Sequence, residues 1–142
     1  MYKIRKMDID DYSEMVNLWK STKGVGLSGN DDSKKSIKVF LQKNPNICFV
    51  AEGENKEIAG TIMAGNDGRR GHIYHLMVKP EHRKKGLAKR LLEKTEKALK
   101  KEGVRKVFLL VFKENKAGNN FWEKSGYKAR KDLNYRDKRI KD

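Results

Sequence analysis

The part of the sequence best suited to chemistry is a short basic run that ends at a glycine, Arg83-Lys84-Lys85-Gly86. An apolar run, 72–79, precedes it and a pattern of helical period follows it, so we expect it between a strand and a helix. The first backbone N–H groups of a helix lack internal partners, and the helix dipole favours anions there. Because glycine leaves the approach open and three cations surround it, the expected ligand is a pyrophosphate.

Other phosphate-binding patterns are absent from the sequence. It contains neither the GxxxxGK[ST] of a nucleotide P-loop nor a GxGxxG that opens a helix. The basic triplet alone is weak evidence, because 34 of the 142 residues are Lys or Arg. Its position between a strand and a helix is what makes it informative.

Side chains that could move a proton lie on the strand before this run. Strict alternation would put His72 and Tyr74 on one face with Leu76 and Val78, and would put His75 on the other face, where we expect it to be packed. A histidine with a pKa near 6.5 suits proton removal through a water molecule. For His72 the alternative is an ordinary surface histidine at the start of a strand.

Three further reactive side chains receive lesser roles. His82 lies in the basic loop and is expected to be exposed to solvent. Glu52 is an additional candidate base at the far end of its strand. Cys48, the single cysteine, lies within the apolar run ICFVA and is expected to be a buried thiol rather than a nucleophile.

Hydrophobic periodicity predicts the elements that position these residues. Caps at Asp8 and at Asp32 or Ser33 begin the first two helices, and the glycine-containing segment 22–31 is a loop. We expect strands at 2–5, 47–53, 58–65, 72–79 and 105–112, helices at 8–20, 33–43, 86–102 and 117–125, and one or two weak strands in 127–141.

The order of these elements predicts an α/β (α+β) fold. A right-handed crossover makes 72–79 and 105–112 parallel neighbours in a mixed sheet with helices on both faces. The run 105–112 is almost continuously apolar, as in a strand covered on both faces. We expect one domain over residues 1–142.

Composition narrows the partners of this domain. The net charge of +15 favours anions, such as nucleic acid, acidic protein or a polyphosphate cofactor, although the spread of the lysines also fits a solvated surface. Aromatic residues are not interleaved with the basic triplet, which argues against a nucleic-acid-binding module. Without an apolar signal region or a run of about 20 apolar residues, a cytoplasmic protein that avoids membranes is expected.

Two segments resemble the GNAT superfamily of N-acetyltransferases. Val78 to Ala88 resembles its acetyl-CoA motif, [QR]-x-x-G-x-[GA], which Arg83, Gly86 and Ala88 match. The segment 115–127, NKAGNNFWEKSGY, resembles its second motif, N-x-x-A-x-x-[FL]-[YW]-x-x-x-G-[FY], with one residue fewer between the first Asn and the Ala. The resemblance covers about residues 50–130 closely and implies a GNAT-like, mostly antiparallel central sheet with a splayed parallel strand pair.

The resemblance also implies a binding site for acetyl-CoA without a metal. Backbone groups of Met77 and Val78 would pair with the pantetheine arm in the wedge between the splayed strands, and the N–H near Met77 would polarise the thioester carbonyl. Lys124 would lie near the adenine end and its 3′-phosphate. The other implied cofactor contacts are the pyrophosphate-binding residues Arg83, Lys84, Lys85, Gly86, Leu87, Ala88 and Lys89, and the groove residues Asn115, Asn120 and Trp122.

The implied reaction is direct attack of an amine on the thioester, which needs a base and an acid. His72 stands where several relatives carry a base. Many relatives have a tyrosine where this sequence has Trp122, and an indole cannot give up a proton at accessible pH. Tyr74, Tyr127 or Tyr135 would therefore protonate the leaving thiolate, or water would.

The sequence leaves the acceptor open among a protein N-terminus, a lysine, a polyamine, an aminoglycoside and a small metabolite. The first helix pair, the loop 22–31 and the region 128–136 are expected to build the acceptor site. Family dimers are common, so a homodimer is one possible state. Two alternative functions stay open: a catalytically weak acetyl-CoA sensor and a basic nucleic-acid-binding module.

Overall fold

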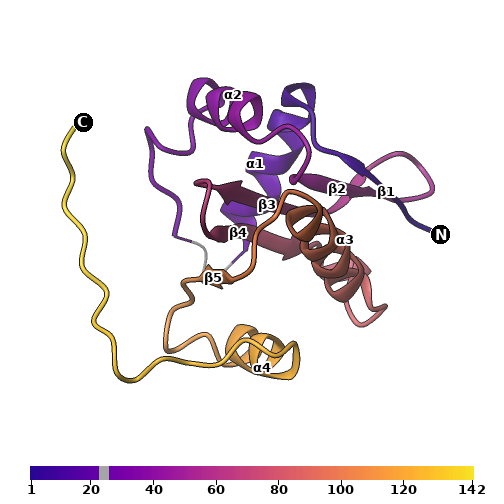
Figure 1. The fold of residues 1–142 in the computed structure, drawn as a ribbon. Helices are drawn as coiled ribbons and strands as arrows, with labels where there is room; N and C mark the ends of the chain where they lie inside the picture. Colours follow the sequence, from indigo (N-terminus) through magenta and orange to yellow (C-terminus); the bar gives the residue numbers. More distant parts are fainter. Residues whose placement is uncertain (23–25) are drawn as a thin grey trace. The chain divides into compact units, whose positions relative to one another are not determined.

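The computed structural model describes residues 1–22 and 26–142, and the chain divides into two compact units, Met1–Leu109 and Leu110–Asp142. The first unit contains the sheet and the second contains one helix and an extended tail (Figure 1). Part of the predicted loop 22–31, residues 23–25, lies outside the described residues. No helix of the described chain is long and apolar enough to cross a lipid bilayer.

The first unit is built on a mixed sheet of five strands in the order β1-β2-β3-β4-β5. The first four strands pair antiparallel, and β4 and β5 pair parallel, which confirms the predicted topology. The strands are β1 (Lys3–Lys6), β2 (Phe49–Glu52), β3 (Ile58–Asn66), β4 (Gly71–Val78) and β5 (Val107–Leu109).

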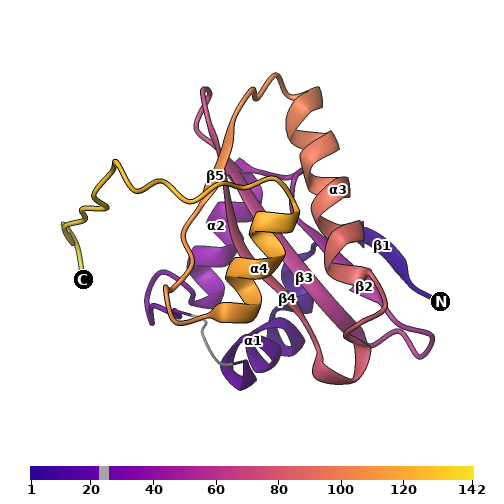
Figure 2. The ribbon, with the colours of Figure 1, turned by 90° about the horizontal axis from the view of Figure 1, so that it is seen from below.

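Helices cover both faces of this sheet, as predicted (Figures 1 and 2). Asp8 caps the chain through a capping box with Asp11, and the hydroxyl of Ser33 accepts the backbone N–H of Ser36 at 3.2 Å. Helices α1 and α2 lie on one face and α3 on the other. The helical elements are η1 (Ile9–Asp11), α1 (Tyr12–Ser21), α2 (Lys34–Lys43), η2 (Pro80–His82) and α3 (Leu87–Lys101).

The core lies between these helices and the two faces of the sheet. On the α1 and α2 face, Met15 and Trp19 are fully buried against strand residues such as Met63 and Met77. On the α3 face, Leu91 and Leu99 are buried against positions where β3 and β4 carry glycine. The amphipathic patterns read from the sequence thus bury the expected stripes.

Strand β4 contains a bulge that the sequence pattern does not predict. Thr61 pairs with Met77 and Met63 with Tyr74, so His75 and its successor together oppose a single residue of β3. His75 adopts a left-handed backbone conformation with φ of +49°. The Thr61 hydroxyl donates to the His75 carbonyl at 2.8 Å, so a buried side chain of β3 holds the bulge in place.

The bulge changes which side chains share a face of β4. Tyr74 packs edge-on against Phe40 of α2, and the His75 ring packs against Trp19 of α1 at 4.5 Å, so both face the α1 and α2 side. Val78 instead faces α3, where its methyl lies beside Gly60 together with a leucine of α3. The predicted alternation is therefore wrong beyond Tyr74, because the extra residue of the bulge reverses it.

Strand β5 and the tail are the other departures from prediction. Only Val107–Leu109 of the predicted strand 105–112 is paired, and Phe108 is 45% exposed rather than covered, because β5 is the edge strand of the sheet. The tail 127–141, which the structure describes throughout, contains no strand. Its few large apolar side chains, Leu133, Tyr135 and Ile140, are 60–91% exposed, so it has little to bury among many charges.

The second unit contains α4 (Lys116–Lys124). Asn115 caps this helix, since its side-chain oxygen accepts the backbone N–H of Gly118 at 2.9 Å. The helix ends at Lys124, and the chain leaves it through Gly126, where φ is +90° and the N–H of Tyr127 returns to the carbonyl of Trp122 at 2.9 Å. The helix predicted at 117–125 is thus confirmed with a shift of one residue.

Candidate functional site

The turn between η2 and α3 is exposed and shaped to receive an anion. Gly86 is the residue before the helix, with φ of +75°, and no side chain caps the helix start. The first helical hydrogen bond runs from Arg90 N–H to the Gly86 carbonyl at 3.1 Å, so the N–H groups of Leu87, Ala88 and Lys89 have no acceptor within the helix. Nothing lies within 4 Å of a Cβ placed on Gly86, which leaves the approach open.

Three basic residues surround this turn, and one of them also ties it to the sheet. Arg83, Lys84 and Lys85 are all exposed. The Arg83 Nε donates to the carbonyl of Val78 at 2.9 Å, across the loop that joins β4 to α3. The exposed turn that we expected for a pyrophosphate is therefore present, with its charge held next to the end of β4.

The end of β4 has an open edge beside this turn. In the described chain, β4 pairs with β5 only from Gly71 to Ile73, so the predicted splay of the parallel pair is present. On its other side β4 pairs with β3, where Lys79 N–H donates to the Ala59 carbonyl at 2.8 Å. Since antiparallel pairs alternate, the backbone groups of Met77 face β3 and those of Val78 face the open edge.

His72 and Tyr74 lie together at the start of this splayed region. The two rings stack at 4.1 Å with an interplanar angle of 15°, and the Phe108 ring of β5 lies 4.4 Å from His72 on another side. Burial lowers the pKa of His72, because the charged imidazolium loses water there. Tyr74 keeps 40% of its surface exposed. The geometry thus offers a neutral imidazole beside an accessible phenol.

The other reactive side chains noted in the sequence are engaged elsewhere. The Glu52 carboxylate accepts from Arg5 at 2.9 Å. The prediction that His82 is exposed is wrong, because its ring bonds the Tyr2 hydroxyl at 2.8 Å and its side chain is only 18% exposed. Cys48 is buried as predicted, and burial raises the pKa of its thiol to about 12.

Asp32 is the residue near this site that sequence reasoning missed. Its carboxylate lies 2.8 Å from Nε2 of His75, and both side chains are sheltered, at 15% and 11% exposure. In the sequence Asp32 stood out only as a helix cap, a role that Ser33 performs. The pair depends on the bulge, which no local pattern reveals, and only the turn of His75 toward α1 brings the two together.

The remaining sequence-predicted residues belong to the second unit and are described within it. The Trp122 ring packs edge-on against Phe121 and Tyr127, each at 5.1 Å, so it is a packing residue of this unit. Asn120 and Lys124 are exposed on α4. Asn115 uses its side-chain oxygen for the cap described above.

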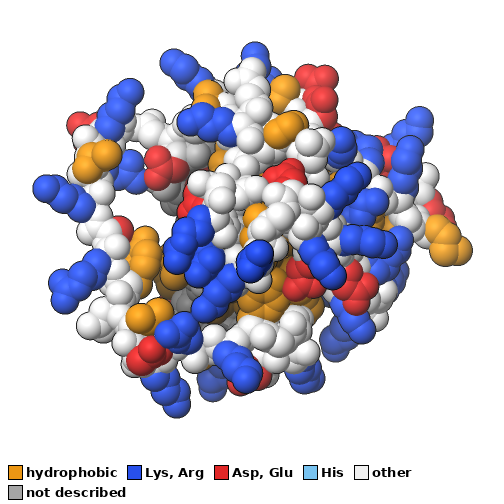
Figure 3. Space-filling model, in the orientation of Figure 1, with side chains coloured by type: hydrophobic (Ala, Val, Ile, Leu, Met, Phe, Trp, Pro, Cys, Tyr) orange, Lys and Arg blue, Asp and Glu red, His pale blue; other side chains and the backbone are white. Residues whose placement is uncertain are grey.

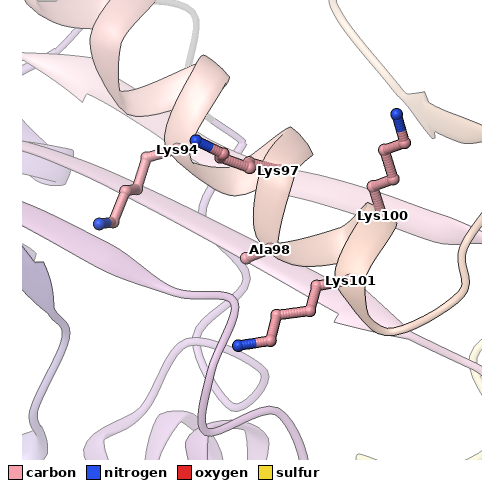
Figure 4. A pocket seen from close by; sticks show the side chains of 5 residues that line it. All are labelled: Lys94, Lys97, Ala98, Lys100 and Lys101. Atoms are coloured by element: carbon pink, nitrogen blue, oxygen red, sulfur yellow. The ribbon is translucent and has the colours of Figure 1, made fainter.

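A separate basic hollow lies on the outer surface of α3. It measures about 480 Å³ and is lined by Ala98 and the lysines Lys94, Lys97, Lys100 and Lys101 (Figure 4). Lys94 follows Gly86 by eight residues, which is about 12 Å along a helix, so the hollow is distinct from the turn. The Nζ of Lys94 lies 5.8 Å from the centre of the Phe49 ring, and the described residues that line the hollow include no histidine, cysteine or carboxylate.

Comparison with known proteins decides the family. The model of the acetyltransferase (GNAT) family matches residues 12–127. The chain belongs to this family of acetyltransferases. The turn before α3 and the splayed strands β4 and β5 both lie within the matched range.

Individual proteins that are similar to this GNAT acetyltransferase are also acetyltransferases. It is 37% identical over 127 residues to an acetyltransferase of Photorhabdus laumondii subsp. laumondii, covering 89% of this chain and 87% of the relative. Its fold is similar to that of an acetyltransferase of Clostridium acetobutylicum solved with acetyl-CoA, with a TM-score of 0.73, 22% identity and 96% of each chain covered. The PaiA N-acetyltransferase of Thermoplasma acidophilum, solved with coenzyme A, gives a TM-score of 0.75 at 26% identity over 88% of each chain.

Proposed function

We propose that this GNAT acetyltransferase transfers the acetyl group of acetyl-CoA to a primary amine by direct attack. The observation that carries the proposal is the exposed turn at Gly86, with free helical N–H groups beside an open strand edge. Two of the structural relatives were solved with acetyl-CoA or coenzyme A. The donor identity therefore rests on both the local geometry and the family.

The turn fits the anionic end of acetyl-CoA. The N–H groups of Leu87, Ala88 and Lys89 would hold the pyrophosphate, and Arg83, Lys84 and Lys85 would add charge. A Cβ at Gly86 would meet no protein atom, so the space in front of the helix is available to a ligand. When bound, acetyl-CoA supplies an activated thioester, and the residues of this chain supply its orientation.

The open edge of β4 would bind the pantetheine arm as an added strand. Val78 supports this role most directly, since its backbone groups face the open side, although its carbonyl already accepts from Arg83. The expected pairing of Met77 with the cofactor does not fit this register, because the backbone groups of Met77 face β3. The N–H that would polarise the thioester carbonyl at the open edge is therefore that of Val78.

His72 is the proposed base. Its neutral imidazole would take a proton from the acceptor ammonium, directly or through water, so that the amine nitrogen can form the new C–N bond. The C–S bond breaks, the nitrogen gives up its second proton to water, and the thiolate of CoA leaves with a proton from Tyr74 or water. Because a simple thiol has a pKa near 8.5, the acid assists without being essential.

Calorimetric titration with acetyl-CoA tests the donor site. Gly86→Asp and Arg83→Ala are each expected to weaken binding by about tenfold or more, since they add an anion or remove a cation at the turn. Lys101→Ala, in the basic hollow of α3, is the matched control and is expected to bind like wild type. Equal affinity for acetyl-CoA in wild type and all three variants would show that the turn is not part of the donor site.

Release of CoA in the presence of spermidine, kanamycin or a lysine-containing peptide with a free N-terminus tests the transfer. Turnover of any of these by wild type, lost in His72→Gln, is expected. Tight binding of acetyl-CoA without turnover of any amine would instead identify an acetyl-CoA sensor. Retained binding to duplex DNA at 0.5 M salt would favour the nucleic-acid alternative.

A further inference from the structure

Two hydrogen bonds between Asp32 and Ser28 close a turn in the loop before α2. The backbone N–H of Asp32 donates to the carbonyl of Ser28 at 2.8 Å, and Oδ2 of Asp32 accepts the N–H of Ser28 at 2.8 Å. Its carbonyl accepts the hydroxyl of Tyr12 from α1 at 2.7 Å. The segment 28–32 is thus a closed turn attached to α1 through the residue that closes it.

The remaining oxygen of Asp32 reaches the bulge of β4. Oδ1 lies 2.8 Å from Nε2 of His75, the residue that adopts the left-handed conformation. The carbonyl of His75 accepts from Thr61, whose hydroxyl in turn accepts from Nε1 of Trp19 at 3.0 Å. One connected set of hydrogen bonds therefore runs from the loop, through Asp32 and His75, to the backbone of the bulge.

The hydrogen-bond roles in this pair follow from the chemistry of the two groups. A carboxylate oxygen accepts hydrogen bonds, so Nε2 of His75 is the donor in this contact. Both carboxylate oxygens of Asp32 are engaged, one by His75 and one by the backbone of Ser28. An amide in place of the carboxylate can keep both bonds only if its oxygen accepts from Ser28, its NH2 donates to Nε2, and the His75 proton moves to Nδ1. Asp32→Asn is therefore a milder change than Asp32→Ala, which removes both bonds.

We propose that Asp32 is a positioning residue for the amine acceptor and that it acts through His75. The inference rests on the proposed function and on the expectation that the loop before α2, whose described part includes 28–32, helps to build the acceptor site. The open edge of β4, beyond the bulge, would hold the thioester. The Asp32–His75 contact would fix the distance between this loop and the thioester, so that the bound amine reaches the thioester carbon. Neither side chain is assigned a role in breaking or forming bonds.

Steady-state kinetics with the fastest of spermidine, kanamycin and the lysine peptide tests this inference. Asp32→Ala is expected to raise the KM for the amine about tenfold or more, with part of the loss in kcat, because small misplacements of reactants are costly. Asp32→Asn is expected to raise this KM less. Affinity for acetyl-CoA, measured by titration, is expected to stay within about twofold of wild type. An unchanged KM in both variants would overturn the proposal.

A matched pair at His75 separates positioning from acid–base chemistry and from simple misfolding. His75→Gln keeps an N–H that can reach Asp32, and His75→Met has a similar shape without it, while both carry the same backbone cost. Positioning predicts near-normal KM for His75→Gln and a raised KM for His75→Met. Equal loss in the two variants would contradict the proposal, since the lost group would then be the imidazole itself.

Hydrogen exchange of the Ser28 amide provides a readout that does not need turnover. It is expected to be protected in wild type and His75→Gln, and to exchange faster in Asp32→Ala and His75→Met. Absence of turnover in wild type with this exchange pattern intact would count against the proposed function alone. Normal turnover with no change in KM or exchange among the variants would count against the positioning role alone.

Discussion

At the scale of single residues, the surroundings of each titratable side chain decide its chemistry. His72 lies against the rings of Tyr74 and Phe108, and burial removes water from the imidazole and disfavours its charged form. His75 lies against Trp19 and is held by a carboxylate. Two histidines on one strand thus have different partners, aromatic rings for His72 and a carboxylate for His75.

The pH dependence of kcat/KM should report the state of His72. Burial lowers the pKa of His72, so the neutral base persists to lower pH than in a free histidine. The acid limb of the profile is therefore expected below the ordinary value of about 6.5. His72→Gln should remove that limb, whereas His82→Gln should retain it. A limb at or above the ordinary value would contradict the assignment of His72 as the base.

The thiol of Cys48 should be inert in the folded protein. It is buried and donates to the Ala64 carbonyl at 3.5 Å, and desolvation raises the pKa of the thiol to about 12. A disulfide reagent such as DTNB at pH 8 is expected to react about a hundredfold slower with the native protein than with protein in guanidinium. The Cys48→Ala variant should still release CoA. Loss of activity in this variant would indicate that Cys48 acts as a covalent nucleophile.

At the scale of elements, glycine sets how closely α3 approaches the sheet. A Cβ at Gly60 of β3 would lie 3.0 Å from the Met77 carbonyl oxygen and 3.1 Å from a methyl of Leu91. The carbonyl belongs to the strand that carries the bulge and cannot move independently of it. Close packing of α3 against the sheet and the present position of β4 thus both require glycine at position 60.

Gly60→Ala should destabilise the protein through this contact. The expected loss is about 1–3 kcal/mol in the free energy of unfolding, measured by urea denaturation, since the core has no room for the methyl group. Gly29→Ala is the control, because a Cβ there meets nothing within 4 Å, and its effect should stay within about 0.5 kcal/mol. Similar midpoints for the two variants would show that α3 can move away at little cost.

How much of this could be predicted depends on whether the cause is local. The strand, basic turn and helix around Gly86 follow from periodicity and one glycine within a short segment, and they are confirmed. The bulge at His75 depends on Thr61 and Trp19, which are distant in sequence, so alternation alone gave the wrong face. The Asp32–His75 pair spans 43 residues, and no spacing rule connects such positions.

The strands predicted in the tail, a segment that the structure describes in full, are absent for a different reason, which is the lack of a partner strand. The few apolar residues of that region suggested pairing, but Leu133 and Tyr135 remain exposed among charged neighbours. A strand needs a partner edge and an apolar face to bury, and neither can be read from a short window. For Phe108, the apolar sequence indicated coverage, but an edge position left it partly exposed.

At the scale of the whole molecule, the excess of positive charge is broadly distributed. The chain has 34 Lys and Arg residues against 19 Asp and Glu, and Figure 3 shows the basic side chains scattered over the visible face rather than gathered in one stripe. Such a surface attracts anions from all directions without selecting one of them. The turn at Gly86 would add selectivity by geometry.

Binding of acetyl-CoA should therefore weaken as salt is added. Raising NaCl from about 0.05 to 0.5 M is expected to increase the Kd several-fold, since screening shortens the reach of the surface charge. Replacing Lys84 and Lys85 by Gln should reduce the salt dependence, and replacing Lys100 and Lys101 by Gln should change it less. A Kd that is independent of salt would contradict an electrostatic contribution to binding.

The splay of β4 away from β5 has a consequence for the protons of the strand itself. The amide of Met77 is directed at β3, whereas that of Val78 is directed at the unpaired side. In deuterium oxide, neighbouring amides should therefore lose their protons at very different rates, slowly at Met77 and rapidly at Val78. Saturation with acetyl-CoA should slow exchange at Val78 and leave exchange at Met77 unchanged, because only the free side of the strand would gain a hydrogen-bond partner.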